Sequence, residues 1–134
     1  MNVRTVEIRT GKQRIVEITD YLTEFAREAN TDGLLHAFLP HATCGLALIE
    51  THAGTEQDLE AAIDRLLPPD ERYHHSHGSR GHGASHVLPA FVSPSLVLPV
   101  ERGEVVLGTW QSVVLVDPNV DNAVRSLRLS LLAG

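Results

Sequence analysis

Apolar and polar residues alternate with a period of two along much of the chain, which is typical of β-strands that turn one face to a core. Residues 3–10 and 14–18 follow this pattern, and we expect them to form a β-hairpin. Residues 34–40 and 45–50 are short apolar runs, so we expect largely buried strands there. Three further strands are expected at 95–100, 104–116 and 123–133. Trp110, the only tryptophan, falls inside the second of these and is expected in the core.

Three other segments are expected to be helices. Residues 19–30 place four apolar side chains on one helical face. Residues 54–69 form the clearest helical pattern, because Thr55 can cap the first turn and two prolines end the segment. A short third helix is expected near residues 84–92. Strands outnumber helices, so the sequence predicts an α+β fold, a single compact domain over residues 1–134 with a largely antiparallel sheet and two or three helices.

Composition and charge exclude several classes of partner. The formal net charge is -6 and the arginines are scattered, so the chain lacks the basic stripe that neutralises nucleic-acid phosphates, and we expect no nucleic-acid partner. No apolar run approaches the roughly 20 residues of a membrane helix, so we expect no membrane association. Cys44 is the only cysteine, which excludes an intramolecular disulfide and a cysteine-rich zinc site. A cytoplasmic location is expected.

Histidine is concentrated in one stretch, YHHSHGSRGHGASH, which contains five of the eight histidines of the chain among glycine and serine. Imidazole is the commonest protein ligand for zinc-like metals and titrates near neutrality. His75 and His77 share a side if their segment is extended, and His82 and His86 share a face if theirs is helical. Neither spacing is a specific metal signature, so an exposed glycine-rich loop in which histidine is one more polar residue is an equal alternative.

A metal centre needs ligands from elsewhere in the chain, because a catalytic metal takes about three protein ligands. His41, between two apolar runs, is the natural contributor, and a hydrogen-bonded core histidine is the alternative. Asp58, in the first turn of the expected helix 54–69, is a candidate carboxylate partner or simply a solvated group. The glycines around Arg80 favour an anion cradle, with a loop that leaves Arg80 in solvent as the alternative.

The segment SLVLPVERGEVVLGTWQSV, residues 95–113, resembles the signature of the YjbQ family, and HATCGLALIE, DLEAAIDRLLP, YHH and SHVLPAFVSPSLVLPV follow that family's order and spacing. The resemblance implies an α+β subunit that assembles as a homotrimer. It also implies His41, His75 and His86 as metal ligands, with Asp58 and Tyr73 nearby. Family members have been described as secondary thiamine-phosphate synthases, which join a pyrimidine diphosphate to a thiazole phosphate with weak activity.

The chain departs from the family pattern between His75 and His86, where many relatives carry acidic residues or asparagine and this chain carries histidine, serine and arginine. We therefore expect a divalent ion, with zinc favoured over nickel or magnesium, because carboxylates favour magnesium and imidazoles favour zinc and nickel. His41, Arg80 and Asp58 are the expected catalytic residues, acting on a small phosphorylated or anionic molecule. A metal-dependent hydrolase and a non-catalytic module for metal or small ligands are the alternatives. The sequence assigns no role to three histidines: His74, His77 and His82.

Overall fold

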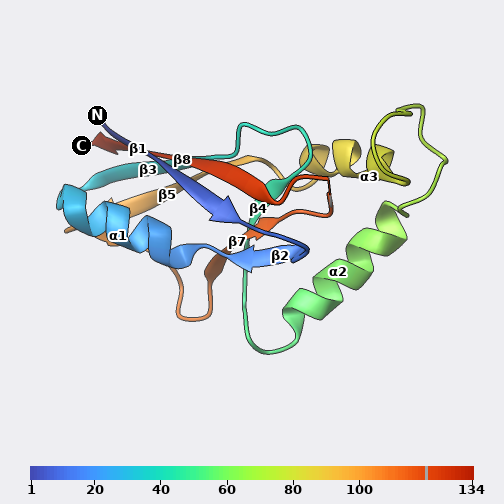
Figure 1. Cartoon of the computed structure of the whole chain (residues 1–134). Coiled ribbons are helices and arrows are strands. Elements are labelled where there is room, and N and C mark those ends of the chain that lie inside the picture. The colour runs from blue at the N-terminus through green and yellow to red at the C-terminus, as the bar shows by residue number, and fades with distance from the viewer. Residues whose placement is uncertain (120) are drawn as a thin grey trace.

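The computed structural model describes residues 1–119 and 121–134, and its strands form two antiparallel sheets (Figure 1). The larger sheet has the strand order β1-β8-β3-β5-β6 and the smaller has β2-β7-β4. The strands of the larger sheet are β1 (Asn2–Arg9), β3 (Gly33–Phe38), β5 (Ser95–Glu101), β6 (Glu104–Val105) and β8 (Val124–Ala133). Those of the smaller sheet are β2 (Ile15–Glu17), β4 (Gly45–Ile49) and β7 (Ser112–Val116). Every described strand pair is antiparallel, as the sequence predicts.

Three helices accompany these sheets, which confirms the α+β class. They are α1 (Thr19–Ala29), α2 (Thr55–Leu66) and α3 (His82–Val87), and a 3-10 turn, Leu88–Ala90, continues α3. In α1 the spacing of Leu22, Phe25 and Ala26 puts all three side chains on the buried face. Among the described residues, none of the helices has the length and apolar character needed to cross a membrane.

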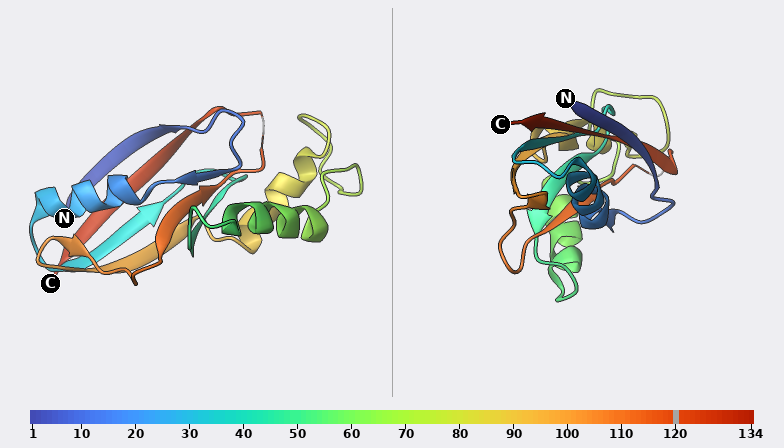
Figure 2. Two further views of the ribbon diagram at one scale, coloured as in Figure 1. Left: turned by 90° about the horizontal axis from the view of Figure 1, so that it is seen from below. Right: turned by 90° about the vertical axis from the view of Figure 1, so that its left-hand side faces the viewer.

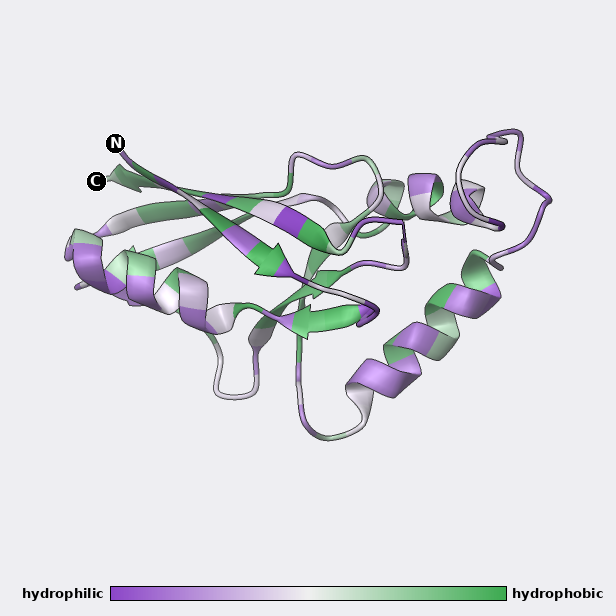
Figure 3. Cartoon of the chain, viewed as in Figure 1, coloured by the Kyte–Doolittle hydropathy of each residue, from purple (hydrophilic) through white to green (hydrophobic). Residues whose placement is uncertain are grey.

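The molecule is elongated and has two unequal ends, as Figure 2 shows. The sheets and α1 enclose the main core at one end, where Leu35, Leu127 and Leu129 are completely buried. At the other end, α2 and α3 lie beside each other and share a smaller core with β7. Hydropathy follows this division, since β7 is hydrophobic along its length whereas the loop between α2 and α3 is largely hydrophilic (Figure 3). That loop carries the histidine stretch.

The expected hairpin of the first two strands is wrong. β1 pairs along its whole length with β8, from Asn2 opposite Leu131 to Arg9 opposite Val124, while β2 pairs with β7 in the smaller sheet. The physical reason is that β8 offers β1 eight ladder positions whereas β2 has only three residues. The segment between β1 and β2 therefore passes from one sheet to the other.

The expected strand 104–116 is also divided, and its tryptophan is not in the core. A turn interrupts the strand, in which the N–H of Gln111 donates to the carbonyl of Gly108 and the N–H of Gly108 donates to the Gln111 side chain. The flanking strands β6 and β7 belong to different sheets. Trp110 lies in this turn and is 73% exposed. Apolar residues alternate on both sides of the turn, so the sequence pattern does not show that the chain passes from one sheet to the other there.

Candidate metal centre

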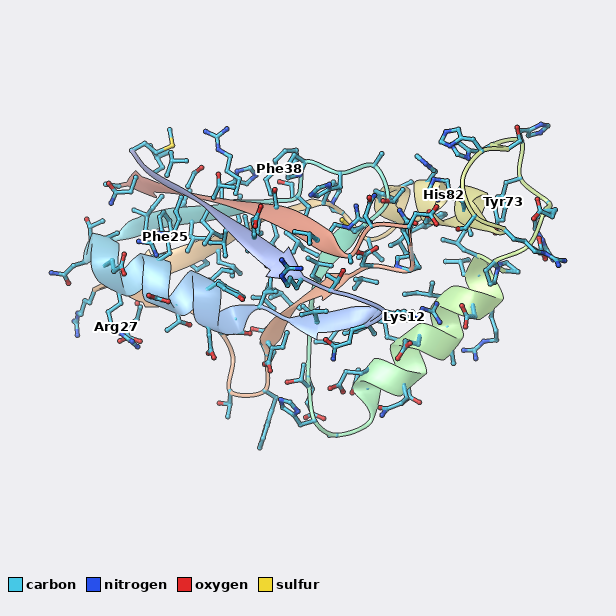
Figure 4. The ribbon with its side chains drawn as sticks, in the orientation of Figure 1. Lys12, Phe25, Arg27, Phe38, Tyr73 and His82 are labelled. Carbon is cyan, nitrogen blue, oxygen red and sulfur yellow. The ribbon has the colours of Figure 1, made fainter. Side chains whose placement is uncertain are left out.

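The histidine stretch begins after α2 and folds back onto α3, so that residues from the loop and the helix meet (Figure 4). Two glycines make this return feasible. Gly78 has a φ of 83°, and a Cβ there would lie 2.8 Å from the ring of His82. Gly81 has a φ of 78°, and a Cβ there would lie 2.5 Å from the carbonyl oxygen of Pro69. A side chain at Gly78 would clash with the His82 ring of α3, and one at Gly81 would clash with the backbone that follows α2.

Four imidazole rings gather where the loop meets the helix. His82 and His86 are one helical turn apart in α3, and their Nε2 atoms are 3.0 Å apart. The loop adds His75, whose ring centroid is 4.0 Å from that of His86, and His77, whose centroid is 3.9 Å from that of His75. One nitrogen from each of His75, His82 and His86 forms a set in which all atoms lie within 4.8 Å of one another. His77 is the exposed member of the four.

This nitrogen set fits a zinc-like ion. A tetrahedral ion with Zn–N bonds of about 2.0–2.1 Å holds its ligand nitrogens about 3.3 Å apart. The His82–His86 pair is already within a few tenths of an ångström of that separation, and His75 has only to move inward. Within the described residues, Nδ1 of His75 and Nδ1 of His82 are both buried without any hydrogen-bond partner. A buried nitrogen with no partner is costly unless a ligand uses its lone pair.

Two rings of the cluster, His75 and His86, are shifted towards the uncharged form. Removal from water lowers the pKa of His75, and the neighbouring His77 and His82 lower it further. Removal from water also lowers the pKa of His86, with contributions from the other three rings. Neutral imidazole is the form that coordinates a metal, so both shifts prepare the cluster for an ion.

One carboxylate, that of Asp121, lies next to the His82 ring on the side that faces away from His86. Oδ2 of Asp121 lies 3.0 Å from Nδ1 of His82, on the side of the ring opposite the Nε2 that faces His86. The same oxygen accepts a hydrogen bond from the backbone N–H of Ser79. This hydrogen bond lowers the pKa of Asp121, so the carboxylate is ionised near neutral pH.

Two cavities adjoin the cluster, and His82 lines both of them. The first, of about 190 Å³, lies inside the loop and is bordered by His75, His77 and Arg80. The second, of about 250 Å³, lies between α2 and the segment around His82, with Ile63 of α2 and Arg80 among its lining residues. Arg80 itself is highly exposed, and its Nε is 3.7 Å from Glu71. Arg80 therefore contributes a cation to the lining of both cavities, beside carboxylates of Asp64 in the second and of Asp70 and Glu71 in the first.

His41 is not part of this nitrogen set. Its Nε2 accepts a hydrogen bond from the backbone N–H of Ser126 at 2.9 Å, so this partly buried histidine is hydrogen-bonded within the fold. Removal from water lowers the pKa of His41, and the positive charge of Arg125 lowers it further. Of the three expected ligands, the structure brings together His75 and His86, adds His82, and leaves His41 against β8.

Two other expected site residues also lie outside the cluster. Asp58 is exposed in the first turn of α2, about 12 Å along the helix axis from the last residue, Leu66. Figure 1 shows that the loop leaves the opposite end of this helix. Tyr73 packs against Gly83 and donates its hydroxyl to the carbonyl of Pro68, so it supports the base of the loop.

A second polar cluster, completely closed, lies beside the main core. The guanidinium of Arg125 is 1% exposed and donates to both carboxylate oxygens of Asp117, at 2.7 and 2.8 Å. Arg125 also donates to Thr43, which accepts a further hydrogen bond from the side chain of Asn119. In the same region burial raises the pKa of the Cys44 thiol to about 11, so this cysteine is not a nucleophile.

The fold and the cluster together define a small α+β protein with a histidine-rich loop at one end, and comparison with known proteins identifies its family. A family model described as UPF0047 protein YjbQ-like matches residues 4–134. A UPF0047 protein of Mycobacterium tuberculosis is 53% identical over 134 residues, which cover the whole of both chains. The UPF0047 protein YjbQ of Escherichia coli O157:H7 is 32% identical over 100 residues, which cover 74% of this chain and 72% of that protein. The chain belongs to the YjbQ-like UPF0047 family.

Solved structures show the same fold. A YbjQ-like protein of unknown function from Sulfolobus solfataricus has a TM-score of 0.91 at 23% identity and covers 99% of this chain and 97% of its own. A protein from Aeropyrum pernix has a TM-score of 0.90 at 24% identity over the whole of both chains. At these identities the likeness concerns the fold, and it confirms the YjbQ-like architecture that the sequence predicts.

Proposed function

We propose that this protein binds one divalent metal ion per chain through His75, His82 and His86, with zinc preferred. The observation that carries the proposal is the set of three imidazole nitrogens within 4.8 Å of one another. An all-imidazole ligand set favours zinc, nickel or copper over magnesium, which prefers oxygen ligands. Three protein ligands leave a coordination position for water or substrate, which is the pattern of catalytic zinc sites.

We propose a phosphorylated small molecule as the substrate, and weak thiamine-phosphate synthase activity as the reaction. In that reaction the thiazole ring nitrogen forms a bond to the methylene carbon of the pyrimidine while the bond from that carbon to the diphosphate oxygen breaks. When bound, a divalent ion supplies positive charge beside the departing diphosphate. Arg80, which lines both cavities, holds the diphosphate oxygens.

Metal binding is tested by zinc titration against a chromogenic chelator, using protein from which any histidine tag has been removed. The separate substitutions His75→Ala, His82→Ala and His86→Ala are each expected to weaken zinc binding by more than about 100-fold. His52→Ala is the matched control, because His52 is exposed and its ring pairs with Glu17, away from the cluster. His41→Ala is expected to bind zinc like the wild type. Unchanged affinity in any one of the three cluster variants would overturn the proposed three-histidine site.

The reaction is tested separately, by following diphosphate release from the pyrimidine diphosphate with and without the thiazole phosphate. Turnover that requires both substrates and zinc, and that is lost in His86→Ala, supports the synthase. Release without the thiazole phosphate indicates the metal-dependent hydrolase instead. Zinc binding without turnover of these substrates identifies a non-catalytic metal-binding module.

We also propose that the chain forms a homotrimer. The number of subunits comes from the family resemblance, and the support in the structure is an exposed apolar patch on the larger sheet. Leu34 of β3 lies opposite Leu132 of β8, and His36 of β3 lies opposite Val97 of β5. The three apolar side chains of this patch, Leu34, Val97 and Leu132, are 49–59% exposed. Exposed apolar patches on a sheet face mark interaction surfaces.

Light scattering coupled to size exclusion tests the assembly. Wild-type protein is expected to have three times the mass of the 14.6 kDa chain. Leu34→Glu and Leu132→Glu each place a charge on the patch and are expected to give monomers, whereas Leu48→Glu, which alters an exposed leucine of the smaller sheet, leaves the mass unchanged. A wild-type monomer at micromolar concentration would exclude the trimer.

A further inference from the structure

We infer that Asp121 is a positioning residue for the metal centre, which holds His82 in the tautomer and orientation that coordinate the ion. This inference rests on the proposed metal site and adds a residue to it. Asp121 is not in the histidine stretch: it lies 35 residues after His86 in the sequence and reaches the cluster only through the fold.

The first step of the argument is the geometry of the His82 ring. Its Nε2 faces the cluster, 3.0 Å from Nε2 of His86, and its Nδ1 is 3.0 Å from Oδ2 of Asp121. A neutral imidazole carries one proton, so an Nε2 that donates its lone pair to a metal leaves the proton on Nδ1. Oδ2 of Asp121 is at ion-pair distance from that Nδ1, which has no hydrogen-bond partner among the described residues, so a ring turned by a bound ion would donate its proton to this carboxylate. Carboxylates in this position raise the basicity of the metal-bound nitrogen.

The second step is the restraint on both partners. The side chain of His82 is only 9% exposed, and Gly78 lies against its ring. Oδ2 of Asp121 also accepts the backbone N–H of Ser79, so the carboxylate ties the loop and the ring together. The backbone N–H of Asp121 donates to the side chain of Asn119.

The third step is the connection to the closed polar cluster. The backbone N–H of Asn119 donates to Asp117, whose carboxylate is held by the buried guanidinium of Arg125. The side chain of Asn119 donates to Thr43 at 3.1 Å. The backbone N–H of Asp121 therefore begins a series of hydrogen bonds that ends on a buried ion pair, which helps to fix the backbone that carries the carboxylate.

The test is a double-mutant cycle on zinc affinity, measured on untagged full-length protein by chelator competition. Asp121→Ala is expected to weaken zinc binding by about 10- to 100-fold. Asp121→Asn is expected to recover part of this loss, because its amide oxygen still accepts a hydrogen bond from Nδ1. Asp70→Asn is the matched control for charge, since Asp70 is a carboxylate of the same loop that pairs with Arg72, and it is expected to change affinity by less than about twofold.

The cycle separates positioning from a general effect on the loop. In the His82→Ala background, Asp121→Ala is expected to cause no further loss, because the carboxylate then has no ring to orient. The absorption spectrum of bound cobalt gives a second readout, and Asp121→Ala is expected to shift its d–d bands while Asp70→Asn leaves them unchanged. Losses that add in the double variant, or an unchanged spectrum in Asp121→Ala, would overturn the inference.

The outcomes also distinguish this inference from the proposed function. If His82→Ala weakens zinc binding and Asp121→Ala does not, the metal site stands and the positioning role fails. If His82→Ala leaves zinc affinity unchanged, His82 is not a ligand and the metal site itself fails, together with any role for Asp121.

Discussion

The two polar clusters of this protein, one around Arg125 and one around His75, differ in how completely their polar groups are hydrogen-bonded. Around Arg125 the charged and polar groups are buried and partnered, with both carboxylate oxygens of Asp117 accepting from the guanidinium. Around His75 the rings contact mainly one another, and two buried nitrogens, Nδ1 of His75 and Nδ1 of His82, have no hydrogen-bond partner within the described residues. A closed network of the first kind stabilises a fold, whereas an open network of the second kind leaves lone pairs available to a ligand. The difference separates a cluster that stabilises the fold from the cluster that we propose as the metal site.

The largest expected effect comes from breaking the closed cluster. Arg125→Met leaves Asp117 as a buried carboxylate without its cation, and is expected to lower the free energy of unfolding by about 3–5 kcal/mol. Urea denaturation at matched protein concentration measures this. The double variant Arg125→Met with Asp117→Leu removes both charges and is expected to be more stable than Arg125→Met alone. A loss below about 1 kcal/mol for the single variant would mean that the ion pair does not stabilise the fold.

Zinc binding at the histidine cluster should change the stability of the folded protein by a smaller amount than the loss of Arg125. At a free zinc concentration of 100 times Kd, the free energy of unfolding is expected to rise by about 2.7 kcal/mol, because the folded state alone assembles the three imidazoles. Thermal unfolding with buffered zinc measures the change. The increase should disappear in His86→Ala and persist in His41→Ala, and the opposite pattern would place the ion at His41.

A weaker effect is expected from pH on the metal-free protein. The folded-state pKa of His41 lies below its usual value, so at a pH below about 6.5 the unfolded chain takes up a proton before the folded protein does. Stability is therefore expected to fall as pH decreases through 6.5, and His75 and His86 contribute with the same sign. His41→Gln removes one such group and keeps an acceptor for the Ser126 N–H.

Denaturation in chelator at a series of pH values from 8 to 5 measures this dependence. The slope of stability against pH is expected to be smaller in His41→Gln than in the wild type. Equal slopes in the two proteins would show that His41 makes no contribution to acid destabilisation.

The smallest effect concerns the attachment of α2, which carries the histidine loop. Arg14 forms two hydrogen bonds to Asp64 of α2, and burial at this pair is partial. The pair is expected to stabilise the fold by about 0.5 kcal/mol, since exposed ion pairs are screened by water. Arg14→Gln should lower the unfolding midpoint in urea slightly, and added salt should reduce the difference from the wild type. A loss above about 2 kcal/mol would show that α2 depends on this contact.

Local sequence patterns predicted where the helices and strands lie better than they predicted which strands pair with each other. The buried face of α1 follows from the spacing of Leu22, Phe25 and Ala26, and strand positions follow from alternation. Alternation does not say which strand a strand pairs with, so the hairpin was wrong, and the turn that exposes Trp110 interrupts an otherwise continuous pattern. Pairing depends on ladder length and on closing a core, which are properties of the whole chain.

The same distinction applies to the metal centre. His75 and His86 were expected ligands, and the helical spacing of His82 and His86 showed that these two share a face. The selection of His82 needed the fold, because the loop must return over the helix before three nitrogens meet. Asp121 had no sequence signal at all, since an aspartate in a turn is ordinarily solvated. His41 shows the converse, because a histidine between apolar strands can be satisfied by a backbone N–H.

The most direct test of the central claim is a crystal structure of the untagged protein with zinc, with diffraction measured on both sides of the zinc absorption edge. We predict one anomalous peak per chain, bonded to His75, His82 and His86, with Asp121 within hydrogen-bond distance of Nδ1 of His82. A peak bonded to His41 without His82, or no peak among the three imidazoles, would contradict the assignment of the open cluster as the functional site.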